Sequence, residues 1–159
     1  MNSLVIYGSR HGNTRKLAEA IAGELGKHGT ALLMSAEKVL SIFPEQTDLV
    51  VVGGPTEAHR MTEPVNELFA RLSRGALNGV KAAAFDTRLR WPKWLAGSAG
   101  SGIVKKLEQA GASVLAPEVS FFVSGQLPVL EPGELERAAA WAASLAARME
   151  SKEPVAAGL

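Results

Sequence analysis

The stretch Leu4-Val5-Ile6-Tyr7-Gly8-Ser9-Arg10-His11-Gly12-Asn13-Thr14 decides how this chain of 159 residues is interpreted. Its apolar beginning predicts a buried strand, and the polar loop leads directly into a helical pattern. A strand that turns at once into a helix leaves backbone N–H groups without partners at the positive end of the helix dipole. Because these groups favour an anion, the stretch predicts a phosphate site.

The side chains of this loop support the same interpretation. Ser9, Asn13 and Thr14 add short donors, while Gly8 and Gly12 let the backbone come close to a ligand. Asn and Thr are also ordinary helix-capping residues, so a well-capped helix start is the alternative explanation.

The composition excludes several classes of function. The chain is 47% apolar and 21% charged, with a net charge of +1, as in a single-domain soluble globule without a field that favours nucleic acid. It contains no cysteine, which excludes disulfides, thiolate metal sites and a cysteine nucleophile. The three histidines lack metal-ligand spacing, so we expect no metal site. No apolar run reaches the roughly 18 residues of a membrane span, and we expect a cytoplasmic protein.

Strand and helix patterns alternate along most of the chain. The predicted strands are Ser3–Tyr7, Thr30–Met34, Asp48–Gly53, Val80–Phe85 and Ala112–Val123, the last divided by Pro117. The predicted helices are 13–28, 63–72, 102–109 and 134–150. This alternation predicts a three-layer α/β/α sandwich, in which helices cover both faces of a five-stranded parallel sheet.

In such a sheet, ligands bind beyond the carboxyl ends of the strands. The loops expected there are 8–14, 53–62 and 86–100, and the last two are longer than usual, which is typical of functional loops. Trp91 and Trp94 offer flat surfaces to a planar aromatic ligand. They could equally cover a hydrophobic surface.

Three motifs in order resemble the flavin loops of flavodoxins. They are Ile6–Thr14 followed by Leu17-Ala18, then Val52-Gly53-Gly54-Pro55-Thr56, and then Ala84-Phe85-Asp86-Thr87-Arg88 with Gly97-Ser98-Ala99. The resemblance implies a flavodoxin-like domain over residues 1–150 with strand order 2-1-3-4-5, and a flexible tail over residues 151–159. It also implies non-covalent binding of flavin mononucleotide (FMN).

Carried over by position, the resemblance predicts the cofactor-binding residues. The phosphate would lie on Ser9, Arg10, His11, Gly12, Asn13 and Thr14. The ring would lie between Pro55, Thr56, Glu57, Ala58, His59 and Arg60 on one side and Asp86, Thr87, Arg88, Trp91, Gly97 and Ser98 on the other. In the family, a backbone carbonyl of the second loop often accepts a hydrogen bond from reduced flavin N5, and Ala58 or a neighbour is the candidate.

Two features depart from a typical flavodoxin. Residues 53–62 contain no aromatic side chain to stack on the ring, which leaves His59 or Met61 to cover it. The proposed edge is also basic instead of acidic. Its cations Arg10, Arg15, Lys16, Arg60, Arg88, Arg90 and Lys93 outnumber Glu57, Glu63 and Asp86. We expect this rim to favour the anionic two-electron-reduced flavin by Coulomb attraction.

The sequence therefore predicts an electron carrier that works between protein partners. The alternatives are an FMN-dependent NAD(P)H:quinone-type reductase and a flavin-free binding module on the same fold. No catalytic residue is predicted, so enzymatic activity stays undecided. The expected partner is a redox protein or a small quinone-like acceptor, and a homodimer could build a second substrate pocket.

Overall fold

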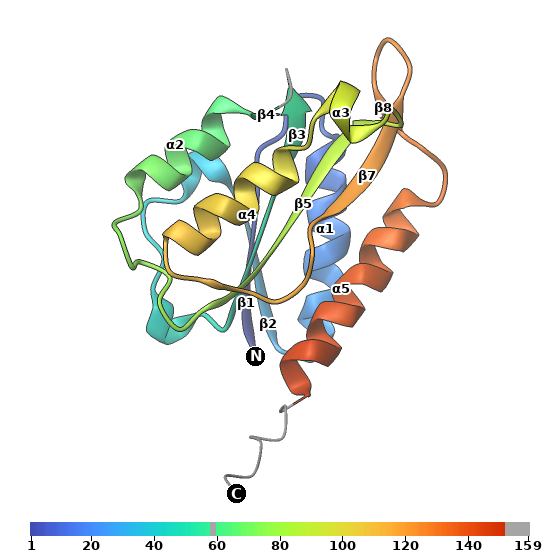
Figure 1. The fold of residues 1–159 in the computed structure, drawn as a ribbon. Coiled ribbons are helices and arrows are strands. Elements are labelled where there is room, and N and C mark those ends of the chain that lie inside the picture. Colours follow the sequence, from blue (N-terminus) through green and yellow to red (C-terminus); the bar gives the residue numbers. More distant parts are fainter. Residues whose placement is uncertain (58–59, 152–159) are drawn as a thin grey trace, which may run out of the picture.

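The computed structural model describes residues 1–57 and 60–151 (Figure 1). The predicted tail beyond Ser151 lies outside them. The strands are β1 (Asn2–Tyr7), β2 (Thr30–Ser35), β3 (Leu49–Glu57), β4 (Arg60–Met61), β5 (Lys81–Leu89), β6 (Ser113–Val114), β7 (Val119–Ser124) and β8 (Val129–Leu130). The α-helices are α1 (Asn13–Leu25), α2 (Glu63–Arg71), α3 (Lys93–Ala96), α4 (Ala99–Gln109) and α5 (Glu134–Glu150), and the 3-10 turns are η1 (Gly26–His28), η2 (Ala36–Lys38) and η3 (Pro44–Gln46).

The sheet has the order β2-β1-β3-β5-β7-β8. Its first five members pair in parallel, which confirms the predicted order 2-1-3-4-5. Three short strands add to this plan: β4 pairs with β3 and β8 with β7, both antiparallel, and β6 pairs in parallel with β5. The last predicted strand is divided at Pro117 into β6 and β7, as expected, because proline lacks the N–H that a ladder needs.

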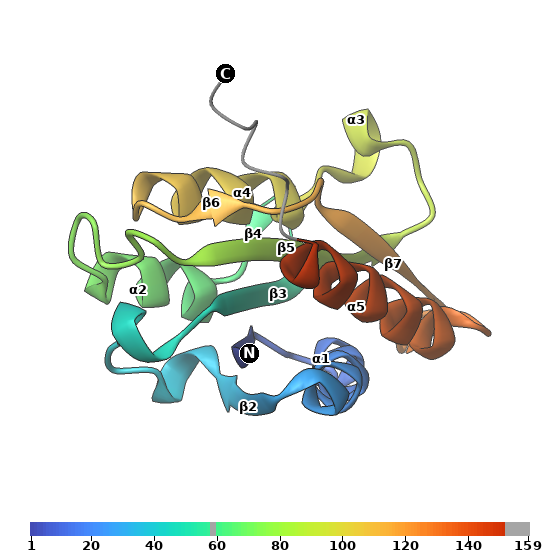
Figure 2. The same cartoon turned by 90° about the horizontal axis from the view of Figure 1, so that it is seen from below.

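Two cores lie on the two faces of the sheet (Figures 1 and 2). Helices α2 and α4 cover one face, where Leu68 and Ile103 pack on Val50 and Val52. Helices α1 and α5 lie side by side on the other face, over Val5, Val51 and Phe85. The continuous β-branched run of β3 is therefore buried on both sides, as its composition predicts.

An aromatic cluster supports the α1–α5 face. The rings of Phe85, Phe121 and Trp141 meet edge to face, with centroids 5.9 to 6.2 Å apart. Gly53 makes room for it, because a Cβ at this position would lie 2.1 Å from the Phe85 ring. Trp141 of α5 packs against this core. Leu135, in the first turn of α5, is 41% exposed and lies outside this core.

Two predicted loops are shorter than expected, because the strands before them continue. The parallel ladder between β3 and β5 extends through Gly54↔Asp86 and Pro55↔Thr87, and β4 then folds back on β3. Backbone hydrogen bonds do not depend on side-chain polarity, so glycine-rich and polar residues continue the strands here. Among the described helices, none is long and apolar enough to cross a membrane.

Candidate functional site

A pocket of about 360 Å³ opens at the carboxyl edge of the sheet. It is lined by Ser9, Arg10, His11, Asn13, Thr14, Pro55, Thr56, Glu57, Thr87, Arg88, Leu89, Val123, Gly125, Gln126 and Pro128. The ends of β1, β3, β5 and β7 therefore contribute to a single site. All three segments predicted to hold the cofactor are represented in its wall.

The loop from β1 to α1 presents unpaired donors next to this pocket. Gly12 caps the helix with φ +85°, a left-handed conformation that glycine adopts without strain. Its N–H donates to Ser9 Oγ at 3.0 Å. The following N–H groups, of Asn13, Thr14 and Arg15, find no acceptor within the described residues. Together with the dipole of a 13-residue helix, they form a site for an anion.

Two buried threonines lie below this helix start. Thr14 Oγ1 and Thr87 Oγ1 are 3.4 Å apart, which joins α1 to the end of β5. Thr14 is 1% exposed and Thr87 is 4% exposed. Each hydroxyl can donate one hydrogen bond and accept others, so the pair adds adjustable donors to the backbone N–H groups.

Asp86 lies beneath the pocket instead of in its wall. Its Oδ2 accepts hydrogen bonds from Ser98 Oγ at 2.7 Å, Gly100 N at 2.9 Å and Thr56 Oγ1 at 3.3 Å. Thr56 Oγ1 in turn accepts from Ala99 N at 2.9 Å. The carboxylate thus holds the second and third predicted segments together at the start of α4, where the helix dipole favours a negative charge.

The hairpin of β7 and β8 supplies pocket residues that sequence reasoning missed. Val123, Gly125, Gln126 and Pro128 come from this hairpin, and Pro128 O accepts a hydrogen bond from Asn13 Nδ2 at 2.8 Å. Leu89, at the end of the extended β5, was missed too. Gly125, with φ +95°, and Pro128 divide two apolar runs, which is the pattern of a hairpin turn.

Several predicted residues lie away from the pocket. Trp91 is 58% exposed and outside the described pocket wall, and Arg60 is exposed on β4. Gly97 and Ser98 lie at the junction of α3 and α4, where Ser98 caps α4 by accepting from Ser101 N. Ala58 and His59, with the predicted carbonyl for flavin N5, lie outside the described residues.

The prediction that Met61 could cover the ring is wrong. Met61 is 9% exposed and belongs to the α2–α4 core. Its Cε would lie 2.8 Å from a Cβ placed on Gly102, so the side chain points toward α4. Arg60 and Met61 are neighbours on a short strand, so their side chains point to opposite faces, and Met61 faces the core.

The basic rim is partly neutralised by carboxylates. Its ion pairs are Arg10–Glu57 at 3.1 Å, Arg15–Glu19 at 3.1 Å, Arg90–Glu131 at 2.7 Å and Lys93–Glu118 at 3.7 Å. Arg88 differs from these four cations, because its guanidinium donates to Ser120 Oγ and to Trp91 O. Glu57 lines the pocket with its partner Arg10, so the net field at the pocket is weaker than the sequence alone suggests.

Two carboxylates flanking the site stay charged more readily than usual. A hydrogen bond from its own backbone N–H lowers the pKa of Glu118 against the opposing effect of burial, and Ser101 and Lys93 assist. At the start of α5, burial opposes ionisation of Glu134, but hydrogen bonds from Arg137 and from Phe122 N–H outweigh it and lower its pKa. Both carboxylates brace elements around the pocket.

The comparisons with known proteins agree with this geometry. The family described as "Flavodoxin domain" matches residues 4–125. Flavodoxin 1 from Bacillus cereus is 21% identical, with a TM-score of 0.75 over 91% of this chain and 97% of its own. Flavodoxin 2 from Bacillus cereus is 18% identical, with a TM-score of 0.77 over 93% and 99%, and a flavodoxin from the domain Archaea is 20% identical, with a TM-score of 0.68 over 94% and 99%. This chain belongs to the flavodoxin domain family.

Proposed function

We propose that this protein binds FMN non-covalently at the carboxyl edge of the sheet and carries electrons between redox partners. The observation that carries the proposal is the start of α1, where three adjacent backbone N–H groups lack acceptors within the described residues. They lie beside the Thr14–Thr87 hydroxyl pair and a pocket built from four strand ends. Membership of the flavodoxin family supports the same cofactor.

Different residues of the pocket would contact the phosphate and the ring of FMN. The N–H groups of Asn13, Thr14 and Arg15 and the two threonine hydroxyls would hold the phosphate. Pro55 and Glu57 on one side, and Leu89 with the β7–β8 hairpin on the other, would enclose the rest of the flavin. FMN supplies the redox chemistry when bound, and the protein orients it and adjusts the local charge.

The affinities for FMN and riboflavin test the phosphate site, because riboflavin is the same ring system without the phosphate. Hydrogen bonds to charged groups contribute roughly 1.5–3 kcal/mol each, so we expect riboflavin to bind at least about 100-fold more weakly. Thr14→Val removes one hydroxyl without changing the side chain's shape and should weaken FMN about tenfold or more. Both affinities can be measured by titrating flavin fluorescence.

Thr30→Val is the matched control, because Thr30 is exposed on β2 and does not line this pocket. Its FMN affinity should equal that of the wild type. Equal affinities for FMN and riboflavin would overturn the phosphate assignment. A chain that binds neither flavin would be the flavin-free binding module.

A second assay distinguishes a carrier from a reductase. With FMN bound, a carrier should oxidise NAD(P)H slowly whether or not a quinone is present. It should exchange electrons with a redox protein partner instead. Fast quinone-dependent oxidation of NAD(P)H would assign the reductase, with the small acceptor reaching the same pocket.

A further inference from the structure

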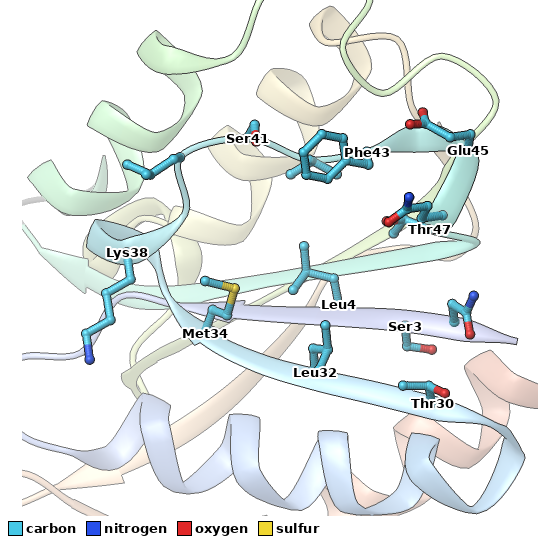
Figure 3. Close-up of a pocket in the computed structure, with 14 residues that line it drawn as sticks. Ser3, Leu4, Thr30, Leu32, Met34, Lys38, Ser41, Phe43, Glu45 and Thr47 are labelled. Carbon is cyan, nitrogen blue, oxygen red and sulfur yellow. The ribbon is translucent and has the colours of Figure 1, made fainter.

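A larger pocket of about 750 Å³ lies at the other edge of the sheet and shares no lining residue with the proposed flavin pocket. Figure 3 shows Leu4, Leu32 and Met34 forming its floor, below Phe43 of the segment that crosses over them. Exposed apolar side chains gather here: Leu32 is 59% exposed, Phe43 55% and Leu40 80%. Exposed apolar clusters of this kind mark interaction sites.

Within the described residues, no α-helix contributes to the lining of this pocket. On the face that carries Leu4 and Leu32, α2 and α4 pack on the central strands, and the pocket is lined by residues of β1, β2 and the segment 38–47. The opposite face of β2 is packed, since Ala31 and Leu33 contact the α1–α5 core. Strand β2 thus has one supported face and one apolar face in water.

The outer edge of β2 is also unpaired, since β2 is the last strand of the sheet. Thr30 N donates to Met1 O at 3.0 Å, so every second residue from Thr30 directs its backbone groups toward β1. The backbone groups of Ala31, Leu33 and Ser35 therefore point away from the sheet. Exposed edges usually carry a charge, a proline or a bulge that blocks pairing, and Thr30–Ser35 contains no charged residue and no proline.

We propose that β2 pairs with β2 of a second copy of this chain, antiparallel about a two-fold axis at Leu33. In this register, Leu33 of each copy pairs with Leu33 of the other, and Ala31 pairs with Ser35, so that every outward N–H and C=O gains a partner. Leu32 of one copy then lies beside Met34 of the other on the pocket face. One continuous sheet runs through the dimer.

The charges at the two ends of the pocket favour a second copy as the partner of the β2 edge. Lys38 and Glu45 lie at opposite ends of the pocket (Figure 3), and neither forms an ion pair within residues 1–57 and 60–151. A two-fold axis reverses one copy relative to the other, so the Lys38 end of each copy approaches the Glu45 end of its mate. The same reversal directs the two candidate flavin pockets to opposite sides and leaves both open.

Sedimentation velocity over a series of concentrations tests the dimer. Leu32→Lys places a charge on the pairing face and should raise the dimer dissociation constant at least about tenfold. Val129→Lys is the matched control, since Val129 is 60% exposed on β8 at the opposite end of the sheet, and it should not change the dissociation constant. In the wild type, hydrogen exchange of the Leu33 amide should slow as the protein concentration rises.

Charge reversal tests the register. Lys38→Glu and Glu45→Lys each place like charges together at two symmetry-related positions and should raise the dissociation constant about tenfold. The double reversal restores opposite charges and should recover wild-type dimerisation. A chain that stays monomeric throughout the series, or a dimer insensitive to Leu32→Lys, overturns the proposal. So does a monomer that takes up an apolar dye at this pocket, which would assign a small-molecule site instead.

Discussion

At the scale of single residues, Asp86 shows how a buried charge can organise a binding site without lining it. The resemblance to flavodoxins assigned it to the cofactor, but it is 0% exposed and accepts three hydrogen bonds through Oδ2. Its Oδ1 is buried without a partner in the described part of the chain. The charge is therefore balanced from one side only, by the start of α4 and two hydroxyls.

Asp86→Asn keeps the size of the side chain and removes the charge. Because hydrogen bonds to a charged acceptor and the favourable helix dipole are both weakened, we expect the free energy of unfolding to fall by about 1–2 kcal/mol. Urea denaturation at pH 7 measures it. Asp48→Asn is the control, since Asp48 is exposed and its side chain accepts one hydrogen bond, from Asn2 N. Equal stabilities of the two variants would show that the Asp86 charge contributes nothing.

Thr14, in contrast to Asp86, lies in the pocket wall where the sequence pattern predicted it. It was assigned to the phosphate site by sequence pattern alone, and it lies in the pocket wall with its hydroxyl next to that of Thr87. The assignment could be made because a helix start is a local feature. Its partner Thr87 is 73 residues away along the chain, and only the parallel order of strands brings the two together.

At the scale of elements, the attachment of α5 to β7 depends on Glu134. This buried carboxylate accepts hydrogen bonds from Phe122 N at 2.7 Å and from Arg137 Nη2 at 2.6 Å. Arg137 also lies over the rings of Phe121 and Phe122, at 4.6 and 5.6 Å from their centroids. One carboxylate therefore joins the start of a helix to the neighbouring strand and fixes the stacked cation.

The lowered pKa of Glu134 makes this attachment sensitive to pH. Since the folded-state pKa lies below the ordinary value of 4.5, the stabilisation is complete above that value and is lost as pH falls through the lowered pKa. Glu134→Gln should cost about 1–3 kcal/mol at pH 7, and this cost should shrink toward pH 3. Urea denaturation at several pH values gives the difference.

Glu136→Gln serves as the control, because Glu136 is exposed in the same turn and forms no ion pair with the described residues. Its stability should follow that of the wild type at every pH. A cost for Glu134→Gln that stays constant down to pH 3 would contradict the linkage.

The elements also show the limit of local patterns. The existence, type and order of the main strands and helices could be predicted, because apolar periodicity reports which residues are buried. The ends of β3 and β5 could not, since hydrogen bonds to a neighbouring strand decide where a strand stops. The β7–β8 hairpin was missed although Gly125 and Pro128 mark its turn, because β8 has only two residues and is too short to show a strand pattern.

At the scale of the whole molecule, the distribution of charged residues sets the electrostatic field at the proposed flavin site. The sequence places seven cations on this edge, and four of them pair with carboxylates that come from β3, α1, the turn after β8 and the β6–β7 link. Counting charges along the chain cannot reveal such pairs. We therefore expect the redox potential of bound FMN to depend more on single carboxylates at the pocket than on the chain's net charge of +1.

Glu57→Gln isolates this effect, because Glu57 lines the pocket and neutralises Arg10. Removing its charge leaves the pocket more positive, so bound FMN should be easier to reduce, by on the order of 0.5 kcal/mol per electron at low salt. Added salt should decrease the shift. Spectroelectrochemical titration measures the potential.

The control is Glu19→Gln, because Glu19 pairs with the Arg15 side chain on α1 and neither residue lines the described pocket. Its potential should change less than that of Glu57→Gln. Equal shifts in the two variants would mean that net charge alone sets the potential. A lower potential in Glu57→Gln would contradict the electrostatic argument.

The strand order was implied by the resemblance to flavodoxins. The sequence by itself determined the α/β class and a polar helix start directly after the first strand. These features depend on contiguous residues, whose periodicity and turn chemistry report burial and backbone conformation directly. Only the tertiary structure decided that Asp86 lies beneath the pocket, that Met61 points into the core, that the β7–β8 hairpin closes the site and that β2 keeps an open apolar edge. Each of these depends on contacts between segments distant in the chain, and such contacts leave no periodic trace in the sequence.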